Sequence, residues 1–202
     1  MGFSHLHVHS EYSLLMSSGR IKDMAKAAAA DGMSALALTD YGNMFGAIQH
    51  YFACEDAGIK PIIGIEIYIA PESRHKKEAD RDNRQPNRRM VLLAKSYKGY
   101  QNLSRISTAG YHEGFYYVPR VDYEVLEEFS EDVIALSGDV MGDAAWTFLN
   151  KGEEESTALI KRLKNIYGED FYLELNRTGL PEWSKVEPYF KKISKELGIE
   201  LV

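Results

Sequence analysis

The sequence predicts a single α/β domain in which short strands alternate with helices. Three observations lead to this fold class. The 202 residues are 45% apolar, which is enough for one substantial core. Short β-rich runs alternate with segments whose apolar residues recur at helical spacing. No second domain boundary interrupts residues 1–202.

Seven short runs, mostly apolar or β-branched, are the predicted strands. They are residues 3–9, 35–38, 62–69, 90–94, 133–136, 171–175 and 199–202. The run 62–69 is nearly continuous, as expected for a strand covered on both faces. Strands interleaved with helices imply parallel neighbours and right-handed crossovers, in either a barrel or an open sheet. Because natural domains rarely stop inside a core strand, we expect the domain to be truncated at its C-terminal end.

The helices between these strands are predicted from their apolar spacing. The first carries Ile21, Met24, Ala25, Ala28 and Ala29 on one side. A second apolar stripe, ended by a glycine at position 58, consists of Met44, Ala47, Ile48, Tyr51 and Phe52. A third stripe, ended by a glycine at position 168, consists of Leu159, Leu163, Ile166 and Tyr167. A fourth helix is expected to open with a capping box at 184–187 and to tolerate a proline at position 188 in its first turn.

One long irregular segment, at about 72–89, is predicted to be a mobile basic loop. Between Arg74 and Arg89 it carries seven lysines and arginines against three acids. We favour a solvated loop over an arm that contacts DNA.

Charge and cysteine content limit the class of protein. The net charge of −6 argues against a self-sufficient nucleic-acid binder, although it allows a domain of a larger DNA enzyme. Cys54 is the sole cysteine, which excludes an intrachain disulfide and favours the cytosol. No apolar run approaches the ~20 residues of a membrane span, and the N-terminus lacks signal-peptide features. We therefore expect a cytoplasmic protein with no membrane partner.

Three histidines at alternate positions, His5, His7 and His9, form the first candidate site. On a strand, residues two apart point to the same face, so all three imidazoles are expected on one side. An H-x-H pair at the carboxyl end of a strand suits a metal ion. The alternative is a polar strand whose histidines are satisfied by other partners.

Two acids extend this candidate site. Asp40 follows the apolar run 35–39, at the strand end where ligands gather in parallel α/β folds. Glu66 lies inside an apolar strand, where an unpaired carboxylate would be costly, so it should face a metal, a cation or hydrogen-bond donors. A helix N-cap for Asp40 and a salt bridge for Glu66 are the simpler alternatives. With the histidines nearby, a shared site is favoured.

Several motifs resemble those of the PHP (polymerase and histidinol phosphatase) family. FSHLHVHSEYSLL at 3–15 and LTDYGNMFG at 38–46 resemble its first two motifs, and AGIKPIIGIE at 57–66 resembles the third. Further stretches are similar to the bacterial replicative polymerase branch rather than to free-standing phosphatases. They are LLAK at 92–95, GYQNL at 99–103, EGFYYVPRVD at 113–122 and ALSG at 135–138.

The resemblance implies a distorted seven-stranded, TIM-barrel-like β/α barrel that binds up to three divalent metals for phosphoester hydrolysis. In polymerases that keep every ligand, the domain is linked to 3′–5′ proofreading. By position, His7 and His9 match the first histidine pair, Asp40 the second-motif acid and Glu66 the third-motif acid.

The sequence departs from the family pattern at several ligand positions. Tyr41, Arg89 and Thr178 stand where active members carry histidine, and Asp139 replaces a cysteine. MSSG at 16–19 replaces the usual Asp-Gly. A multinuclear site needs most of its ligands, and a fixed guanidinium repels metal directly. We therefore expect a degenerate site that holds zinc, manganese or magnesium at a partial position, or none. We also expect Arg89 to donate to Asp40, Glu66 or Asp139.

The function implied is that of the N-terminal PHP domain of a bacterial DNA-directed DNA polymerase, a nucleotidyltransferase of DNA replication. The polymerase aspartates of such a protein lie in a later domain. The implied partners are the rest of the polymerase chain, a docked proofreading exonuclease subunit, other replisome subunits, and DNA through the full protein. For this chain a non-catalytic scaffold is preferred. An active metal-dependent phosphoesterase, or a 3′–5′ exonuclease, stays open as the alternative.

Overall fold

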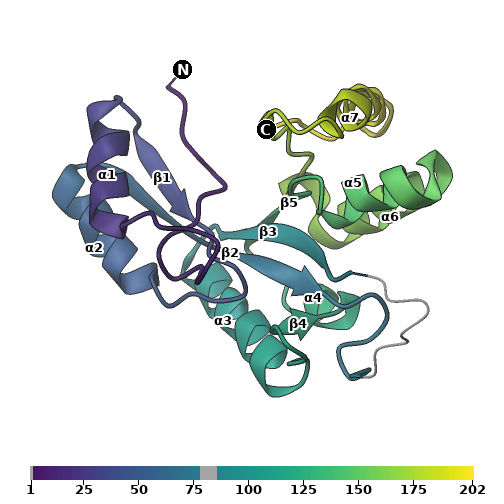
Figure 1. The fold of residues 1–202 in the computed structure, drawn as a ribbon, viewed down its shortest axis with the longest axis horizontal. Helices are drawn as coiled ribbons and strands as arrows, with labels where there is room; N and C mark the ends of the chain where they lie inside the picture. The colour runs from purple at the N-terminus through teal and green to yellow at the C-terminus, as the bar shows by residue number, and fades with distance from the viewer. Residues whose placement is uncertain (1, 78–85) are drawn as a thin grey trace.

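A computed structural model describes residues 2–77 and 86–202 (Figure 1). The helices are α1 (Ile21–Ala30), α2 (Ala47–Ala57), α3 (Tyr97–His112), α4 (Tyr123–Glu128), α5 (Asp143–Lys151), α6 (Glu153–Tyr167), the short 3₁₀ helix η1 (Gly168–Asp170) and α7 (Trp183–Leu197). The strands are β1 (Ala35–Leu38), β2 (Lys60–Ile69), β3 (Arg88–Ala94), β4 (Arg120–Val121), β5 (Val133–Leu136) and β6 (Phe171–Tyr172).

Six strands form one mixed sheet in the part of the chain that the structure describes. Their order is β1-β2-β3-β5-β6, and the short β4 also pairs with β2. The prediction of parallel neighbours is wrong for β3, which runs antiparallel to both β2 and β5. The pairs β1–β2 and β5–β6 are parallel, as predicted. Residues 70–87 separate β2 from β3, and antiparallel neighbours do not require a helical crossover between them.

The expected strand at 3–9 is wrong, although this segment lies along the free edge of β1. Its bonds to β1 are irregular, because His5 O accepts from Ala37 N and Val8 O accepts from Thr39 N. Between these two bonds the N-terminal segment advances by three residues, whereas the chain along β1 advances by two. This extra residue breaks the ladder, as in a β-bulge, and ends the simple alternation of side chains.

The predicted strand at 199–202 is also wrong, and the one at 171–175 is shorter than expected. Past β6 the chain pairs with the C-terminal residues through an isolated bridge between Leu173 and Leu201. The N-terminal segment and the C-terminal residues therefore lie on the two edges of the sheet. The sheet remains open, so the expected closed seven-stranded barrel is not observed in the described residues.

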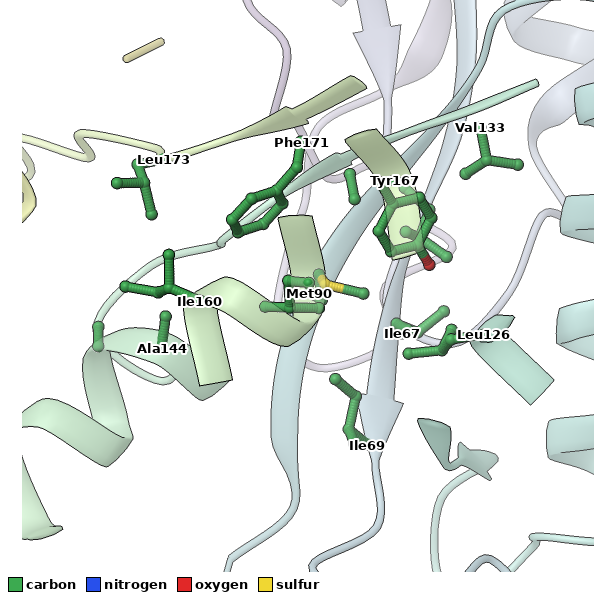
Figure 2. Close-up of a cluster of buried hydrophobic side chains, with 14 of the residues drawn as sticks. Ile67, Ile69, Met90, Leu126, Val133, Ala144, Ile160, Tyr167, Phe171 and Leu173 are labelled. Carbon is green, nitrogen blue, oxygen red and sulfur yellow. The ribbon is translucent and has the colours of Figure 1, made fainter. Parts of the chain in front are cut away.

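The main hydrophobic core lies between the sheet and helices α3 to α7. Figure 2 shows Ile67 and Ile69 of β2 beside Met90 of β3, with Ile160 and Phe171 nearby. A second cluster packs α1 and α2 against β1, which Figure 1 shows beside the rest of the sheet. A smaller cluster on the other face of the sheet includes Ala37, Val91, Leu93 and Leu136. This third cluster lies on the face that carries the candidate site.

Helices α1 and α6 bury, fully or partly, the apolar residues that their spacing predicts. Helices α2 and α7 differ from the prediction. Helix α2 ends at the left-handed Gly58 as predicted, but much of its apolar stripe is exposed, including Ile48 and Phe52. Helix α7 begins at Trp183, before the expected capping box, so Pro188 lies in its second turn. Among the described residues, no helix has both the length and the apolar character needed to cross a membrane.

The predicted mobile loop at about 72–89 is wrong in its C-terminal bound, and its mobility stays a prediction. Arg88 and Arg89 belong to β3, and Arg74 is bound to three carboxylates. Residues 78–85, the middle of the predicted loop, lie outside the described residues.

Candidate metal centre

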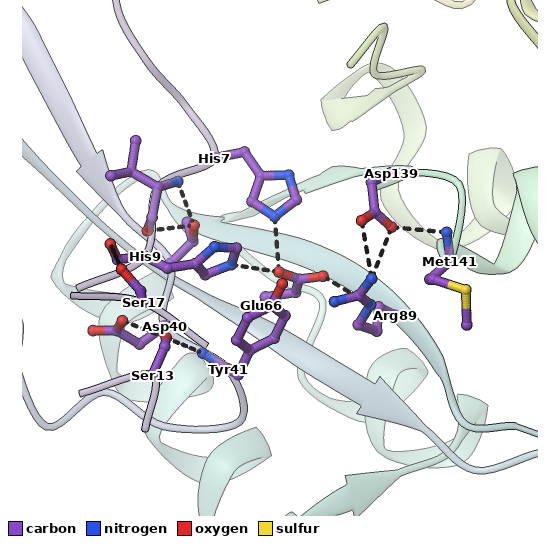
Figure 3. Close-up of polar contacts among 12 residues, drawn as sticks. His7, His9, Ser13, Ser17, Asp40, Tyr41, Glu66, Arg89, Asp139 and Met141 are labelled. Carbon is purple, nitrogen blue, oxygen red and sulfur yellow. Dashed lines mark hydrogen bonds and ion pairs between the residues drawn. The ribbon is translucent and has the colours of Figure 1, made fainter. Parts of the chain in front are cut away.

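Two histidines and one glutamate converge at the second half of β2. His7 Nε2 lies 2.8 Å, and His9 Nε2 2.6 Å, from the same oxygen, Oε2 of Glu66 (Figure 3). One ligand atom from each residue lies within 4.8 Å of the others, so the group could hold a metal ion. Nitrogen and carboxylate ligands together are typical of zinc sites, and His₂Glu is a known catalytic set.

Side chains alternate between the two faces of the sheet along β2, and this alternation places Glu66 in the group. Ile65, Ile67 and Ile69 face the main core, so Glu66 points to the opposite face of the sheet. The Glu66 side chain is fully buried. The prediction that it would face a cation or hydrogen-bond donors is confirmed, because both histidines and Arg89 contact it.

The ion pair between His7 and its carboxylates changes the proton affinity of both groups. Burial lowers the pKa of His7, but the hydrogen bonds and charges of Glu174 and Glu66 outweigh burial and raise it to about 10. Burial raises the pKa of Glu66, but hydrogen bonds from His7 and His9 outweigh it and lower the pKa to about 2. Without a metal, His7 is therefore an imidazolium that donates from both ring nitrogens.

Arg89 lies between Glu66 and Asp139, as Figure 3 shows. Its Nε is 3.3 Å from Glu66 Oε1, and its Nη2 is 2.9 Å from Asp139 Oδ2. The prediction that Arg89 donates to one of the nearby acids is confirmed. Asp139 follows the left-handed Gly138 and also accepts from Met141 N, which fixes the loop after β5.

Tyr41 covers the histidine side of the centre. Its ring stacks on His9 with 4.0 Å between ring centroids, and the Arg89 guanidinium carbon is 5.1 Å from the Tyr41 ring centroid. Burial raises the pKa of the Tyr41 hydroxyl to about 12, so this phenol is a poor anionic ligand near neutral pH.

The other predicted site residues lie apart from this group. Asp40 is buried, and its carboxylate accepts from Ser10 N, Ser10 Oγ and Ser13 Oγ at 2.6–2.7 Å. It does not cap α2, whose N-cap is Gly46, so that alternative is wrong. Its role as a ligand stays a prediction. Thr178 is exposed in a bend after β6.

His5 does not join the other two histidines. It is exposed, and its ring meets Phe3 edge to face. The expectation of three imidazoles on one face is wrong because the segment bulges between His5 and Val8.

Sequence reasoning missed Glu174, which lies two residues past β6. Its Oε1 is 2.7 Å from His7 Nδ1, and both side chains are only 9% exposed. The signal for it was present, because Glu174 stands between Leu173 and Leu175 as Glu66 stands between two isoleucines.

The model of the family described as "PHP domain" matches residues 5–178. That span covers the whole candidate centre and most of the chain. The chain therefore belongs to the PHP domain family.

Several of its relatives by sequence are named DNA polymerase III subunit alpha. The protein from Borreliella burgdorferi is 44% identical over 199 residues, which is 98% of this chain and 17% of the relative. The protein from Treponema pallidum is 41% identical over 206 residues, 100% of this chain and 17% of the relative. The chain thus spans about a sixth of the length of these relatives.

Solved structures share the fold at low sequence identity. One is a protein from Bifidobacterium adolescentis named as a candidate metal-dependent phosphoesterase, with a TM-score of 0.57 and 14% identity, covering 98% of this chain and 85% of that one. Another is an amidohydrolase from Chromobacterium violaceum with bound sulfate and no metal. Its TM-score is 0.59 at 14% identity, and the match covers 98% of this chain and 84% of that one.

Proposed function

We propose that this chain is the PHP domain of a bacterial replicative DNA polymerase, the polymerase III α subunit, and that its own site does not hydrolyse phosphoesters. Support for the parent protein comes from relatives of that name that match nearly the whole chain. Nucleotidyl transfer during DNA replication then belongs to other parts of the polymerase.

The observation that carries the non-hydrolytic role is the position of Arg89. Its guanidinium bridges Glu66 and Asp139, two carboxylates that would otherwise attract metal ions. Arginine cannot give up its proton in a protein, so the charge is permanent. A multinuclear centre needs several anionic donors free at once, and here two of them already have a cation.

A single divalent ion remains compatible with His7, His9 and Glu66. The carboxylates of Glu66, Asp139 and Glu174 against the guanidinium of Arg89 leave a net charge of −2 when both histidines are neutral. One zinc or manganese ion would balance that charge. Such an ion could polarise a phosphoryl oxygen or lower the pKa of a bound water. These residues supply one metal position, whereas a two-metal site stabilises both the attacking and the leaving oxygen of an in-line displacement.

The competing function is an active phosphoesterase or 3′–5′ proofreading exonuclease. To decide between them, the purified protein is incubated with manganese or zinc and either a phosphomonoester or 3′-labelled single-stranded DNA. We expect no hydrolysis above background. Hydrolysis that disappears in both His9→Ala and Glu66→Gln, but persists in the control Glu169→Gln on the exposed η1, would reject the proposal.

The scaffold role is supported by an exposed apolar surface, which we call the α2 face. Ile48, Tyr51 and Phe52 of α2, together with the preceding Phe45, are 42–66% exposed. An apolar surface of this kind is typical of a protein contact. We propose that a proofreading exonuclease subunit docks on this domain. Contact with the rest of the polymerase chain is the alternative occupant of the α2 face.

A titration separates these two roles. The exonuclease subunit from the same organism is added to the full polymerase and to its Ile48→Asp/Phe52→Asp variant. We expect the double variant to bind more weakly, whereas Glu169→Gln should bind normally. If the wild-type polymerase does not bind the exonuclease, the docking role fails. If the double variant binds normally, the α2 face is not the docking site.

A further inference from the structure

We infer that Glu174 is a positioning residue that fixes His7 with its Nε2 toward the metal position. This inference rests on the single-ion site proposed above. It concerns the Nδ1 side of the His7 imidazole, which contacts Glu174 rather than a predicted ligand.

The two nitrogens of His7 have different partners. Nε2 faces Glu66 Oε2 at 2.8 Å, within the group that could hold a metal, while Nδ1 faces Glu174 Oε1 at 2.7 Å. A metal bound at Nε2 requires that nitrogen to be free of its proton. The remaining proton then lies on Nδ1, where Glu174 accepts it. A carboxylate behind a metal-binding histidine orients the ring and raises its basicity.

Glu174 itself is held in place by the residue that follows β5 and by a neighbouring side chain. Glu174 N donates to Ser137 Oγ at 2.9 Å, and Asn176 Nδ2 donates to Glu174 Oε1 at 3.3 Å. The preceding Leu173 is fully buried in the main core. These two hydrogen bonds and the buried neighbour hold Glu174 in position, as a positioning residue requires.

The second oxygen of Glu174 makes the contact with His7 more important. Oε2 is buried and has no hydrogen-bond partner among the described residues. A buried carboxylate with one open oxygen is costly unless a positive group or a strong donor faces it. The Nδ1–H of His7 supplies that donor in both the metal-free and the metal-bound state, so binding a metal does not leave Glu174 unpaired.

The contact also joins two distant parts of the sheet. His7 lies in the segment along the free edge of β1, and Glu174 lies just past β6 at the opposite end of the strand order. The two edges meet at this contact, although the two residues are 167 positions apart in the sequence. The orientation of His7 therefore depends on the correct placement of β6.

The first test measures metal affinity in the full polypeptide that carries this domain. Zinc and manganese are titrated against a competing chelator for the wild type, Glu174→Gln and the matched control Glu169→Gln. We expect Glu174→Gln to bind each metal about 10- to 100-fold more weakly, and the control to match the wild type. Urea unfolding without metal measures the structural effect of each substitution separately.

A second measurement needs no substitution. Histidine ¹H–¹⁵N spectra of the zinc-loaded wild type should show the His7 proton on Nδ1. Unchanged affinity in a folded Glu174→Gln would overturn this inference while leaving the single-ion site intact. A proton on Nε2 would show that His7 does not bind the metal through Nε2 and would overturn this inference as well. If the wild type binds neither metal, the single-ion site fails, and the inference fails with it.

Discussion

Two arginines in this molecule each face several carboxylates, and their surroundings differ. Arg89 bridges Glu66 and Asp139 beside the histidines. Arg74, near the end of β2, contacts Glu113, Asp122 and Glu124 at 2.7–2.9 Å. Arg74 has more ion pairs than Arg89, and their distances are as short or shorter.

Burial reverses that ranking. Glu113 and Glu124 have side chains 45% and 80% exposed, so water screens both pairs. Glu66 is fully buried, and Asp139 is 21% exposed. A buried charge depends on its partners far more than an exposed one does. Buried charges, rather than a large number of ion pairs, therefore indicate where a candidate site lies in this molecule.

The largest expected effect is at Glu66. Glu66→Ala removes the shared partner of His7, His9 and Arg89, and should lower the free energy of unfolding by about 3–5 kcal/mol. Glu66→Gln keeps the volume and one acceptor, so it should lose less. Urea denaturation in the presence of a chelator measures both. A loss for Glu66→Ala no larger than that for Glu113→Ala would contradict the role assigned to burial.

A smaller effect is expected at Arg89, where a substitution should lower stability but raise zinc affinity. Arg89→Met retains length but removes the charge from Glu66 and Asp139, so stability without metal should fall by about 2–3 kcal/mol. Removing the cation should raise zinc affinity about tenfold, because Arg89 no longer repels the ion. Unfolding and metal titration on the same variant test this divergence. If zinc affinity does not rise, Arg89 does not compete with the metal.

Parts of the fold were predictable because local sequence decides them. The strands at 35–38 and 133–136 match β1 and β5, since short buried apolar runs between helices have few alternatives. The edge segments 3–9 and 199–202 were wrong because pairing at an edge depends on the partner across it. The direction of β3 depends on its pairing with β2 and β5, which no local pattern specifies.

The candidate site shows the same division. Glu66 was predictable because a charge within an apolar strand must find a partner. Arg89 was identified by the family resemblance, and its pairing was expected because clustered carboxylates need a cation. Glu174 has the same pattern as Glu66, yet its partner His7 is 167 positions away in the sequence. The sequence identifies such charges, but their pairing is a property of the tertiary fold.

At Arg74 we expect a modest effect despite its three ion pairs. Arg74→Ala should cost about 1–2 kcal/mol, since Asp122 is nearly buried and loses a charged partner. The backbone bond from Arg74 N to Asp122 Oδ2, 2.9 Å, survives the substitution and limits the loss. Urea denaturation beside Arg89→Met gives the comparison directly. A larger loss at Arg74 than at Arg89 would reverse the ranking of the two centres.

The smallest effect is expected at Glu124, where the pair with Arg74 is open to solvent. Its 2.9 Å contact is as short as the Arg89–Asp139 contact, so distance alone predicts similar contributions. Water and salt screen the exposed pair, and ordering two long side chains costs entropy, so the net gain is close to zero. Glu124→Ala should leave the urea midpoint unchanged within error at both 50 mM and 500 mM sodium chloride. Asp139→Ala, which removes a contact of the same length at the more buried Arg89 centre, should shift the midpoint at both salt concentrations. Equal shifts for the two variants would show that burial does not separate the two arginine centres.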